Sequence, residues 1–150
     1  MQLLDIAYHE HSTAPMQTKT TSMVTRVAGV DGDCRGKPGK RQVTVLSQDQ
    51  WQLACDELNT PMPWTYRRAN LLVDGISFDA SYLGKQIQIG QLLLLITRET
   101  DPCPRMDAQH QGLTQALMPD WRGGVCCKVL ADGRISVGDT VQILDLNPSK

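Results

Sequence analysis

The segment Thr100–Asp107 places one cysteine, Cys103, between two prolines, shortly after the apolar run Leu92–Ile96. Each proline lacks a backbone N–H and fixes φ near −65°, so we expect a stiff loop without regular structure. Arg98 and Arg105 lie close in sequence, and a nearby cation favours the thiolate, the form of cysteine that attacks electrophiles and binds metals. Cys103 is therefore the first candidate for chemistry, and the alternative is an unreactive loop cysteine.

The loop over residues 31–41 is a second candidate, because it mixes glycines with basic side chains. Glycines allow a close backbone approach and clustered cations offset a negative charge, which together suit a phosphate group. A solvated, mobile loop is the alternative. Arg41 is the strongest candidate because it begins a strand, whereas Asp31 and Asp33 are interpreted as turn residues. The basic residues of the loop are Arg35, Lys37, Lys40 and Arg41.

A third group consists of Arg67, Arg68 and Asn70. The two arginines could bind an anion, or they could pair with Asp74 or Asp79 on the surface. Asparagine at the start of a strand has low β-propensity and offers both a donor and an acceptor. We therefore consider Arg68 and Asn70 as binding residues.

The overall composition excludes several classes of function. The chain has 150 residues and a net charge of −1, so no general positive field draws it to nucleic acid or to a membrane. Its longest apolar stretch is far below the ~20 residues of a membrane-spanning helix. The N-terminus lacks the basic-then-apolar order of a signal peptide. We expect a cytoplasmic protein with neither nucleic acid nor membrane as a partner.

The five cysteines follow no regular spacing and form no Cys-x-x-Cys pair, which argues against a structural zinc site. Free thiols in a reducing compartment fit best. Cys126 and Cys127 would point to opposite faces of a strand, one buried and one partly exposed. The histidines His9, His11 and His110 are too scattered for a triad or a metal site, and His110 would assist proton transfer only if its loop folded back.

Short apolar segments with alternating patterns predict about eight strands. Glycine in the middle of two of them, at Gly90 and Gly138, predicts a bulge or a barrel corner. Asp132-Gly133 predicts a type I′ hairpin turn. The expected strands include residues 3–8, 23–30, 42–46, 87–95 and 135–143, together with strands within 67–76 and around 126–127.

One helix has clear local support. Ser47–Gln50 fits a capping box, in which the cap hydroxyl and the third residue's side chain satisfy each other's exposed N–H groups. The helix should end at Asn59–Pro61. A weaker helical pattern covers Gln111–Met118. The residues expected to form the buried stripe of the first helix are Trp51, Ala54, Cys55 and Leu58.

These elements predict an α+β, β-rich fold with one or two short helices. A closed or partly closed β-barrel would remove the edges that so many strands expose. Leucine, valine and isoleucine must fill the core, because the chain has one phenylalanine and three tyrosines. No linker divides the sequence, so a single domain over residues 1–150 is expected.

Several fragments, in their order and spacing, resemble the MOSC domain, the module found at the C-terminus of molybdenum cofactor sulfurases. The resemblance covers roughly residues 25–144 and implies a β-barrel-like fold. The fragments are Gly29–Asp33, Arg41–Val43, Arg68–Leu71, Ile87–Gly90, Pro102-Cys103 and Gly133–Asp139.

The resemblance also implies a site. In such relatives a cysteine ligates molybdenum or carries sulfur, and the phosphate of the pterin cofactor lies among basic side chains. Cys103 takes the place of this thiol, and Arg68 and Asn70 match an Arg-x-Asn element that lies against the cofactor. The basic residues expected to bind the molybdenum cofactor (molybdopterin) are Lys37, Arg41 and Arg105, beside Arg68.

Three functions follow as hypotheses. The first is a molybdenum-cofactor-binding domain, independent of pyridoxal phosphate, that reduces N-hydroxylated small molecules with electrons from a partner protein. The second is a sulfur carrier or cofactor-delivery module with a persulfide on Cys103 and a sulfur-transfer partner. The third is a non-catalytic binding domain. Relatives that reduce amidoximes carry a Cys-x-x-Cys pair at this loop, whereas this chain has Met106 at the second position.

Overall fold

The computed structural model describes residues 1–145, and residues 146–150 of the expected domain lie outside the described part. The strands are β1 (Leu3–Tyr8), β2 (Gln17–Lys19), β3 (Thr21–Thr25), β4 (Gly29–Val30), β5 (Val43–Ser47), β6 (Leu71–Val73), β7 (Gln86–Ile89), β8 (Leu92–Glu99), β9 (Val125–Ala131), β10 (Gly133–Ser136) and β11 (Val141–Leu144). The α-helices are α1 (Gln48–Glu57) and α2 (Leu113–Ala116). Short 3₁₀ helices are η1 (Trp64–Arg67), η2 (Ala80–Tyr82), η3 (Pro104–Ala108) and η4 (Pro119–Trp121).

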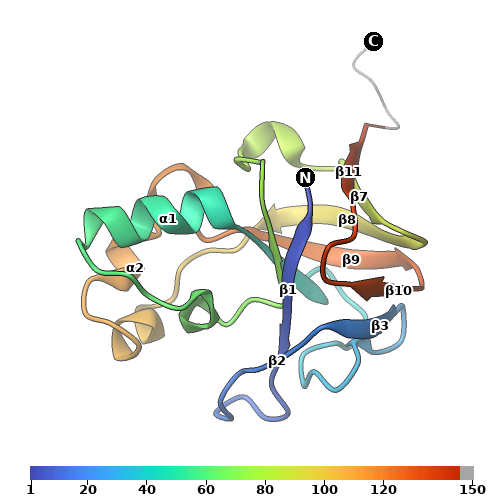
Figure 1. Cartoon of the computed structure of the whole chain (residues 1–150), viewed down its shortest axis with the longest axis horizontal. Coiled ribbons are helices and arrows are strands. Elements are labelled where there is room, and N and C mark those ends of the chain that lie inside the picture. Colours follow the sequence, from blue (N-terminus) through green and yellow to red (C-terminus); the bar gives the residue numbers. More distant parts are fainter. Residues whose placement is uncertain (146–150) are drawn as a thin grey trace.

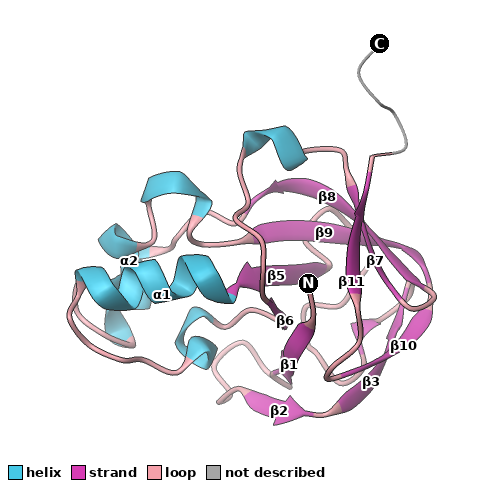
Figure 2. Cartoon of the chain, turned by 45° about the horizontal axis from the view of Figure 1, so that its top comes forward, coloured by secondary structure: helices cyan, strands magenta, loops and turns pink. Residues whose placement is uncertain are grey.

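The strands form two sheets. The larger has the order β11-β7-β8-β9-β5-β6-β1-β2, and the smaller has the order β10-β3-β4. Only β5 and β6 run parallel in the larger sheet, while its other pairs are antiparallel. Figures 1 and 2 show α1 and α2 together at one end of the molecule and most strands at the other. None of the helices in residues 1–145 has the length and apolar character needed to cross a bilayer.

The expected α+β, β-rich class is confirmed, but a closed barrel is wrong. The outermost strands of the large sheet, β11 and β2, do not pair with each other. The chain leaves this sheet after β2 and again after β9, because β3 and β10 pair with one another instead. An isolated bridge between Gln2 and Thr140 connects the start of β1 to the start of β11. The result is two open sheets that share a core.

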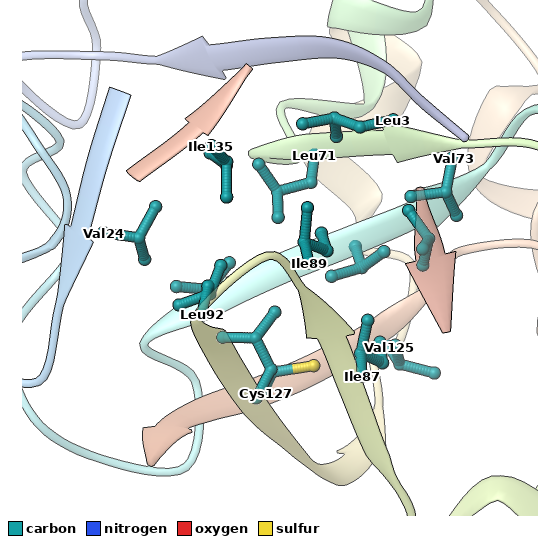
Figure 3. Packing of buried hydrophobic residues seen from close by; sticks show 14 of the residues in the cluster. Leu3, Val24, Leu71, Val73, Ile87, Ile89, Leu92, Val125, Cys127 and Ile135 are labelled. Carbon is teal, nitrogen blue, oxygen red and sulfur yellow. The ribbon is translucent and has the colours of Figure 1, made fainter. Parts of the chain in front are cut away.

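The main core lies where the two sheets meet. Its side chains come from the large sheet and from β3, β4 and β10 of the small sheet, and Figure 3 shows them pointing into one interior. Leucine, valine and isoleucine dominate it, as expected, although Phe78 is also buried there. A second cluster lies under the helices and includes Leu46, Trp51, Leu72, Leu113 and Leu117.

Helix α1 begins where the sequence predicts. The Ser47 hydroxyl accepts a hydrogen bond from the backbone N of Gln50 at 3.2 Å, as an N-cap does. The reciprocal half of the capping box is absent, because the Gln50 side chain donates to the carbonyls of Phe78 and Asp120. Its Oε1 accepts from the Phe78 backbone N at 2.9 Å. Gln50 thus connects α1 to the segments around Phe78 and Asp120. These segments are distant in sequence and come close to the helix only in the folded chain.

The glycines expected to interrupt strands lie in turns instead. Gly90 has φ +59° and starts a two-residue hairpin loop, since Ile89 pairs with Leu92 across β7 and β8. A positive φ is open to glycine at little steric cost, and it is common in such short hairpins. Gly138 likewise has φ +97° between β10 and β11. The expectation of a bulge or barrel corner at both positions is therefore wrong.

The predicted hairpin at Asp132-Gly133 is also wrong. Strands β9 and β10 follow each other with only Asp132 between them, yet they belong to different sheets. Gly133 has no positive φ, and its role is spatial, because a methyl group there would collide with the backbone of Leu92. The Asp132 carboxylate accepts a hydrogen bond from the backbone N of Arg26 at 2.7 Å. This crossing point needs a residue without a side chain.

We expect Gly133→Ala to lower the free energy of unfolding by about 1–3 kcal/mol, the usual range for overpacking a rigid site. The new methyl group meets backbone atoms, which cannot rotate away as a side chain can. Gly138→Ala serves as the matched control, since the space around Gly138 is open and only its positive φ opposes the substitution. Urea denaturation checks the order, and an equal or larger loss in Gly138→Ala would contradict the steric argument.

Candidate functional site

One cavity of about 540 Å³ brings most of the predicted site residues together. Five arginine side chains line it, although the whole chain carries a net charge of −1. The cavity is thus a local region of positive charge, which favours an anionic ligand. The arginines are Arg35, Arg41, Arg67, Arg68 and Arg105.

Cys103 is exposed and lines this cavity. Its carbonyl accepts hydrogen bonds from the backbone N of Met106 at 2.8 Å and from the hydroxyl of Thr114 at 2.9 Å. The expected loop without regular structure is wrong on one side, because Pro104 begins the 3₁₀ helix η3. Proline suits a first helical position, where its missing N–H is not needed. The backbone that carries the thiol is therefore held in place from two sides.

Arg67 is the buried cation of the site, with 4% of its surface exposed. Its Nε donates to the carbonyl of Gly123 at 2.9 Å and its Nη2 to that of Thr100 at 3.1 Å. Nη1 lies 3.7 Å from the sulfur of Met106. All of these partners are neutral, and no carboxylate within residues 1–145 forms an ion pair with Arg67.

Burial, followed by the charge of Arg41, lowers the pKa of Arg67 to about 10. The guanidinium therefore keeps its charge at neutral pH. A buried charge without a counter-charge is costly, so an anion in the cavity would offset part of that cost. The alternative, in which Arg67 and Arg68 pair with Asp74 or Asp79, does not occur among the described ion pairs.

Arg68 lines the cavity and also hydrogen-bonds with a segment that forms part of the cavity wall. The residue adopts φ +62° at the end of η1. Its Nη2 donates to the carbonyls of Ala14 at 2.7 Å and Ser12 at 3.2 Å. The polar segment after β1, which includes the lining residues Ser12 and Thr13, is therefore attached through this guanidinium.

Asn70 lines the cavity as well, but its amide is largely used within the protein. Its Oδ1 accepts from the backbone N of Thr44 at 3.0 Å, and its Nδ2 donates to the carbonyl of Ala7 at 3.2 Å. Asn70 thereby joins β1 and β5 at the end where β6 has not yet begun. These hydrogen bonds give a structural reason for an asparagine at this position despite its low β-propensity. Any contact with a ligand would be an additional reason.

The loop over residues 31–41 contributes unequally to the cavity. Arg35 and Arg41 line it, whereas the exposed Lys37 is not among the lining residues. The loop packs closely against the backbone of Ala28 at Gly36, where a methyl group would collide with it. The Gln42 side chain donates to the carbonyls of Gly36 and Arg26. This anchoring fixes the backbone from which Arg35 and Arg41 extend.

Sequence reasoning missed His9 and Asp33, which lie together in the cavity wall. His9 Nδ1 is 3.2 Å from Asp33 Oδ1, and the His9 backbone N donates to the same oxygen at 3.1 Å. The two residues are 24 positions apart, and Asp33 has the appearance of an ordinary turn residue. No spacing signal in the sequence indicates the pair.

The neighbouring cysteines of β9 differ from the expectation. Cys126 and Cys127 are both fully buried, so the expected partial exposure of one is wrong. Burial raises the pKa of Cys127 well above its usual value, while Cys126 Sγ lies 3.2 Å from the hydroxyl of Thr100. His110 hydrogen-bonds with the carbonyl of Gln111 and does not line the cavity. In residues 1–145 no cluster of three or more His, Cys, Asp or Glu residues is placed to hold a metal.

We expect Asn70→Ala to lower the free energy of unfolding by about 1–3 kcal/mol, because it leaves the partly buried backbone N of Thr44 and the buried carbonyl of Ala7 without these partners. Chemical denaturation measures the loss. Gln52→Ala is the control, since the Gln52 side chain bonds to Asp56 on the exposed face of α1. An Asn70→Ala variant as stable as this control would show that the amide has no structural role.

Solved structures of bacterial proteins share this fold. YuaD from Bacillus subtilis matches with a TM-score of 0.79 at 16% identity, covering 95% of this chain and 94% of that one. YiiM from Geobacillus stearothermophilus matches with a TM-score of 0.80 at 16% identity, covering 99% of this chain and 77% of that one. YiiM from Escherichia coli matches with a TM-score of 0.71 at 16% identity, covering 97% and 70%. At such identities the likeness concerns the fold alone.

No curated protein matches the chain closely enough to count as similar. The family model described as the MOSC domain matches residues 15–142. That range includes most of the strands of both sheets. It also includes the cavity residues discussed above except three N-terminal ones, His9, Ser12 and Thr13. The chain therefore belongs to the MOSC domain family.

Proposed function

We propose that this domain binds a molybdenum–pterin cofactor and that Cys103 provides a thiolate ligand to the metal. The observation that supports this most is the placement of one exposed thiol and five arginines on a single cavity. A soft thiolate suits molybdenum, and guanidinium groups suit a phosphate. MOSC domains are associated with the molybdenum cofactor, and the family membership of the chain adds to this argument.

The residues present fit such a group. A volume of about 540 Å³ lies within the range of about 300–1,000 Å³ typical of pockets for small molecules and cofactors. Arg67 presents a buried positive charge with neutral partners only, and an anionic ligand would compensate it. Arg41 and Arg105 are exposed side chains on the cavity, free to turn towards a phosphate.

Each of these residues would have a distinct task. Cys103 would hold the metal, with its backbone fixed by Met106 and Thr114. Arg67 and Arg41 would place positive charge beside the negatively charged cofactor. The bound cofactor would supply two-electron redox chemistry at molybdenum. We propose an N-hydroxylated small molecule as the substrate class and a separate protein as the electron donor.

A second candidate function is sulfur carriage, with a persulfide on Cys103. The exposure of this cysteine supports it, because a partner's thiol must reach the sulfur to exchange it. The same arginines would stabilise the negative charge of a persulfide. The two functions make different predictions for the loss of Cys103. The first predicts that bound metal is lost, and the second predicts that labile sulfur is lost.

The first test measures metal and pterin in protein from a host that makes the cofactor. We expect molybdenum and pterin to approach one equivalent per chain, by elemental analysis and by fluorescence of the oxidised pterin. Cys103→Ser should lose most of the metal, because a hydroxyl is a poor ligand for a soft metal. Cys34→Ser is the matched control, since Cys34 is a free, partly exposed cysteine that does not line the cavity.

Metal equally absent from wild type and Cys103→Ser would contradict the cofactor proposal. Sulfur that is released by a reductant from wild type, and not from Cys103→Ser, would then support the carrier function. Retention of full molybdenum in Cys103→Ser would show that this thiol is not the ligand. A loss in Cys34→Ser as large as in Cys103→Ser would point to disturbed folding.

The second test separates the cavity arginines from the rest of the basic loop. Arg105→Gln and Arg41→Gln should reduce pterin retention about three- to tenfold, because each removes a charge-assisted hydrogen bond to the phosphate. Lys37→Gln removes the same charge from an exposed side chain that does not line the cavity, and it should retain pterin as wild type does. Pterin fluorescence after dialysis measures all three, and an equal loss in Lys37→Gln would mean that net charge alone matters.

A further inference from the structure

The charges along the cavity fall into two groups. Around Cys103, the ionisable groups that influence the pKa of Arg67 are Arg41, Cys126, Cys103 and Asp101. Around His9, the groups that influence the imidazole pKa are Asp33, Arg68 and Arg35. No group belongs to both sets. We call the part of the cavity wall at Cys103 the thiol end and the part at His9 the histidine end.

The histidine end is built by close contacts between β1 and the loop after β4. The backbone N of His9 donates to Asp33 Oδ1 at 3.1 Å, and the His9 carbonyl accepts from the backbone N of Cys34 at 2.9 Å. Asp33 Oδ2 accepts from the backbone N of Arg35 at 3.2 Å. These bonds hold the imidazole and the carboxylate against each other without involving the ring.

The imidazole itself is buried and poorly satisfied. His9 is 4% exposed, and the Asp33 side chain is 1% exposed. Nδ1 lies 3.2 Å from the carboxylate but is not aligned for a hydrogen bond with it. Nε2 makes no hydrogen bond with any residue in 1–145, and His9 lines the cavity. The His9 imidazole thus has a nitrogen without a hydrogen-bond partner beside two arginines. A ligand with several hydrogen-bond acceptors would fit there.

We propose that His9 is the proton-gated group of an oxyanion-binding site at this end of the cavity, and that an oxyanion bound beside Arg35 and Arg68 brings one proton from solvent onto the imidazole. The ligand class is a tetrahedral oxyanion, such as sulfate or a phosphate monoester. No covalent bond forms or breaks, and the proton is the only additional species taken up.

The physical reason is a change in the charge balance around His9. Without a ligand, burial lowers the pKa of His9 below its usual value, and the charges of Arg68 and Arg35 lower it further, against the opposing effect of Asp33. Cys34, which does not line the cavity, is a further ionisable group that influences the pKa of Arg68. A bound oxyanion offsets both arginines and attracts the imidazolium, so the pKa of His9 rises. Once protonated, the ring has N–H groups on both nitrogens and donates to the anion.

The direction of the pH dependence follows from linkage, since the proton and the anion strengthen each other's binding by the same factor. Affinity for the oxyanion should rise as pH falls through the interval between the raised and the lowered pKa of His9. Outside that interval it should be constant. The inference stands apart from the molybdenum proposal, because it concerns only an anion and the groups around His9.

The test uses sulfate, which keeps its charge of −2 across the neutral range and therefore takes up no proton itself. Isothermal titration calorimetry at pH 6 to 8, in buffers of different protonation enthalpy, counts the protons taken up. We expect up to about one proton per sulfate and an affinity that weakens severalfold from pH 6 to pH 8. Ionic strength is held constant with chloride, because surface attraction is screened by salt.

His9→Gln keeps a polar side chain without a titrating ring, and it should bind sulfate with neither proton uptake nor pH dependence. His11→Gln is the matched control, since His11 is exposed and does not line the cavity, and it should behave as wild type does. Imidazole NMR on wild type gives the same answer without a substitution, because the His9 resonance should titrate at higher pH when sulfate is present.

Three outcomes would overturn the inference. They are the absence of sulfate binding at pH 6, binding without proton uptake, and proton uptake that persists in His9→Gln. The molybdenum and pterin content of the same preparations is measured separately. A failure of the sulfate result with metal present therefore leaves the cofactor proposal intact, and the reverse failure leaves the histidine site intact.

Discussion

The buried guanidinium of Arg67 is the interaction on which the site depends. It joins the carbonyl of Thr100, just beyond the end of β8, to the carbonyl of Gly123, just before β9. It also reaches the sulfur of Met106 in η3. Because the segment between these points carries Cys103, the position of the thiol depends on a cation in the interior. A methyl group at Gly123 would collide with the Thr100 carbonyl that accepts from this cation.

This arrangement is stable because hydrogen bonds replace the water that the guanidinium loses. Neutral carbonyls satisfy its donors but leave its charge uncompensated. The cost of that charge is the reason why the cavity favours anions. The same cation therefore has a structural effect, on the loops around β8 and β9, and a functional effect, on the ligand that the cavity accepts.

The walls of the cavity come from segments that are distant in sequence. His9 directly follows β1, the loop after β4 supplies Asp33 and Arg35, and the end of η1 supplies Arg67 and Arg68. Asn70, which follows η1, hydrogen-bonds with both β1 and β5. These bonds bring the end of β1 close to the end of η1. The cavity thus forms beside the ends of strands from both sheets, and the loops at these ends carry the charged groups.

The sequence by itself determined the features that depend on neighbouring residues. The Ser47 cap and the stripe of Trp51, Ala54 and Cys55 define α1, and the two prolines place Cys103 in a loop. The tertiary structure decided the features that depend on distant partners. Gly133 lies at a crossing between sheets rather than in a hairpin, because its neighbour in space is Leu92.

The contact between His9 and Asp33 at the site likewise could not be predicted from the sequence. Their pairing depends on how β1 and the loop after β4 are held together, which no local pattern records. Local propensities act over a few residues, so they define helices, turns and exposed loops. Whether strands close a barrel, and which charges share a cavity, is decided by packing and hydrogen bonds between segments that only the complete fold brings into contact.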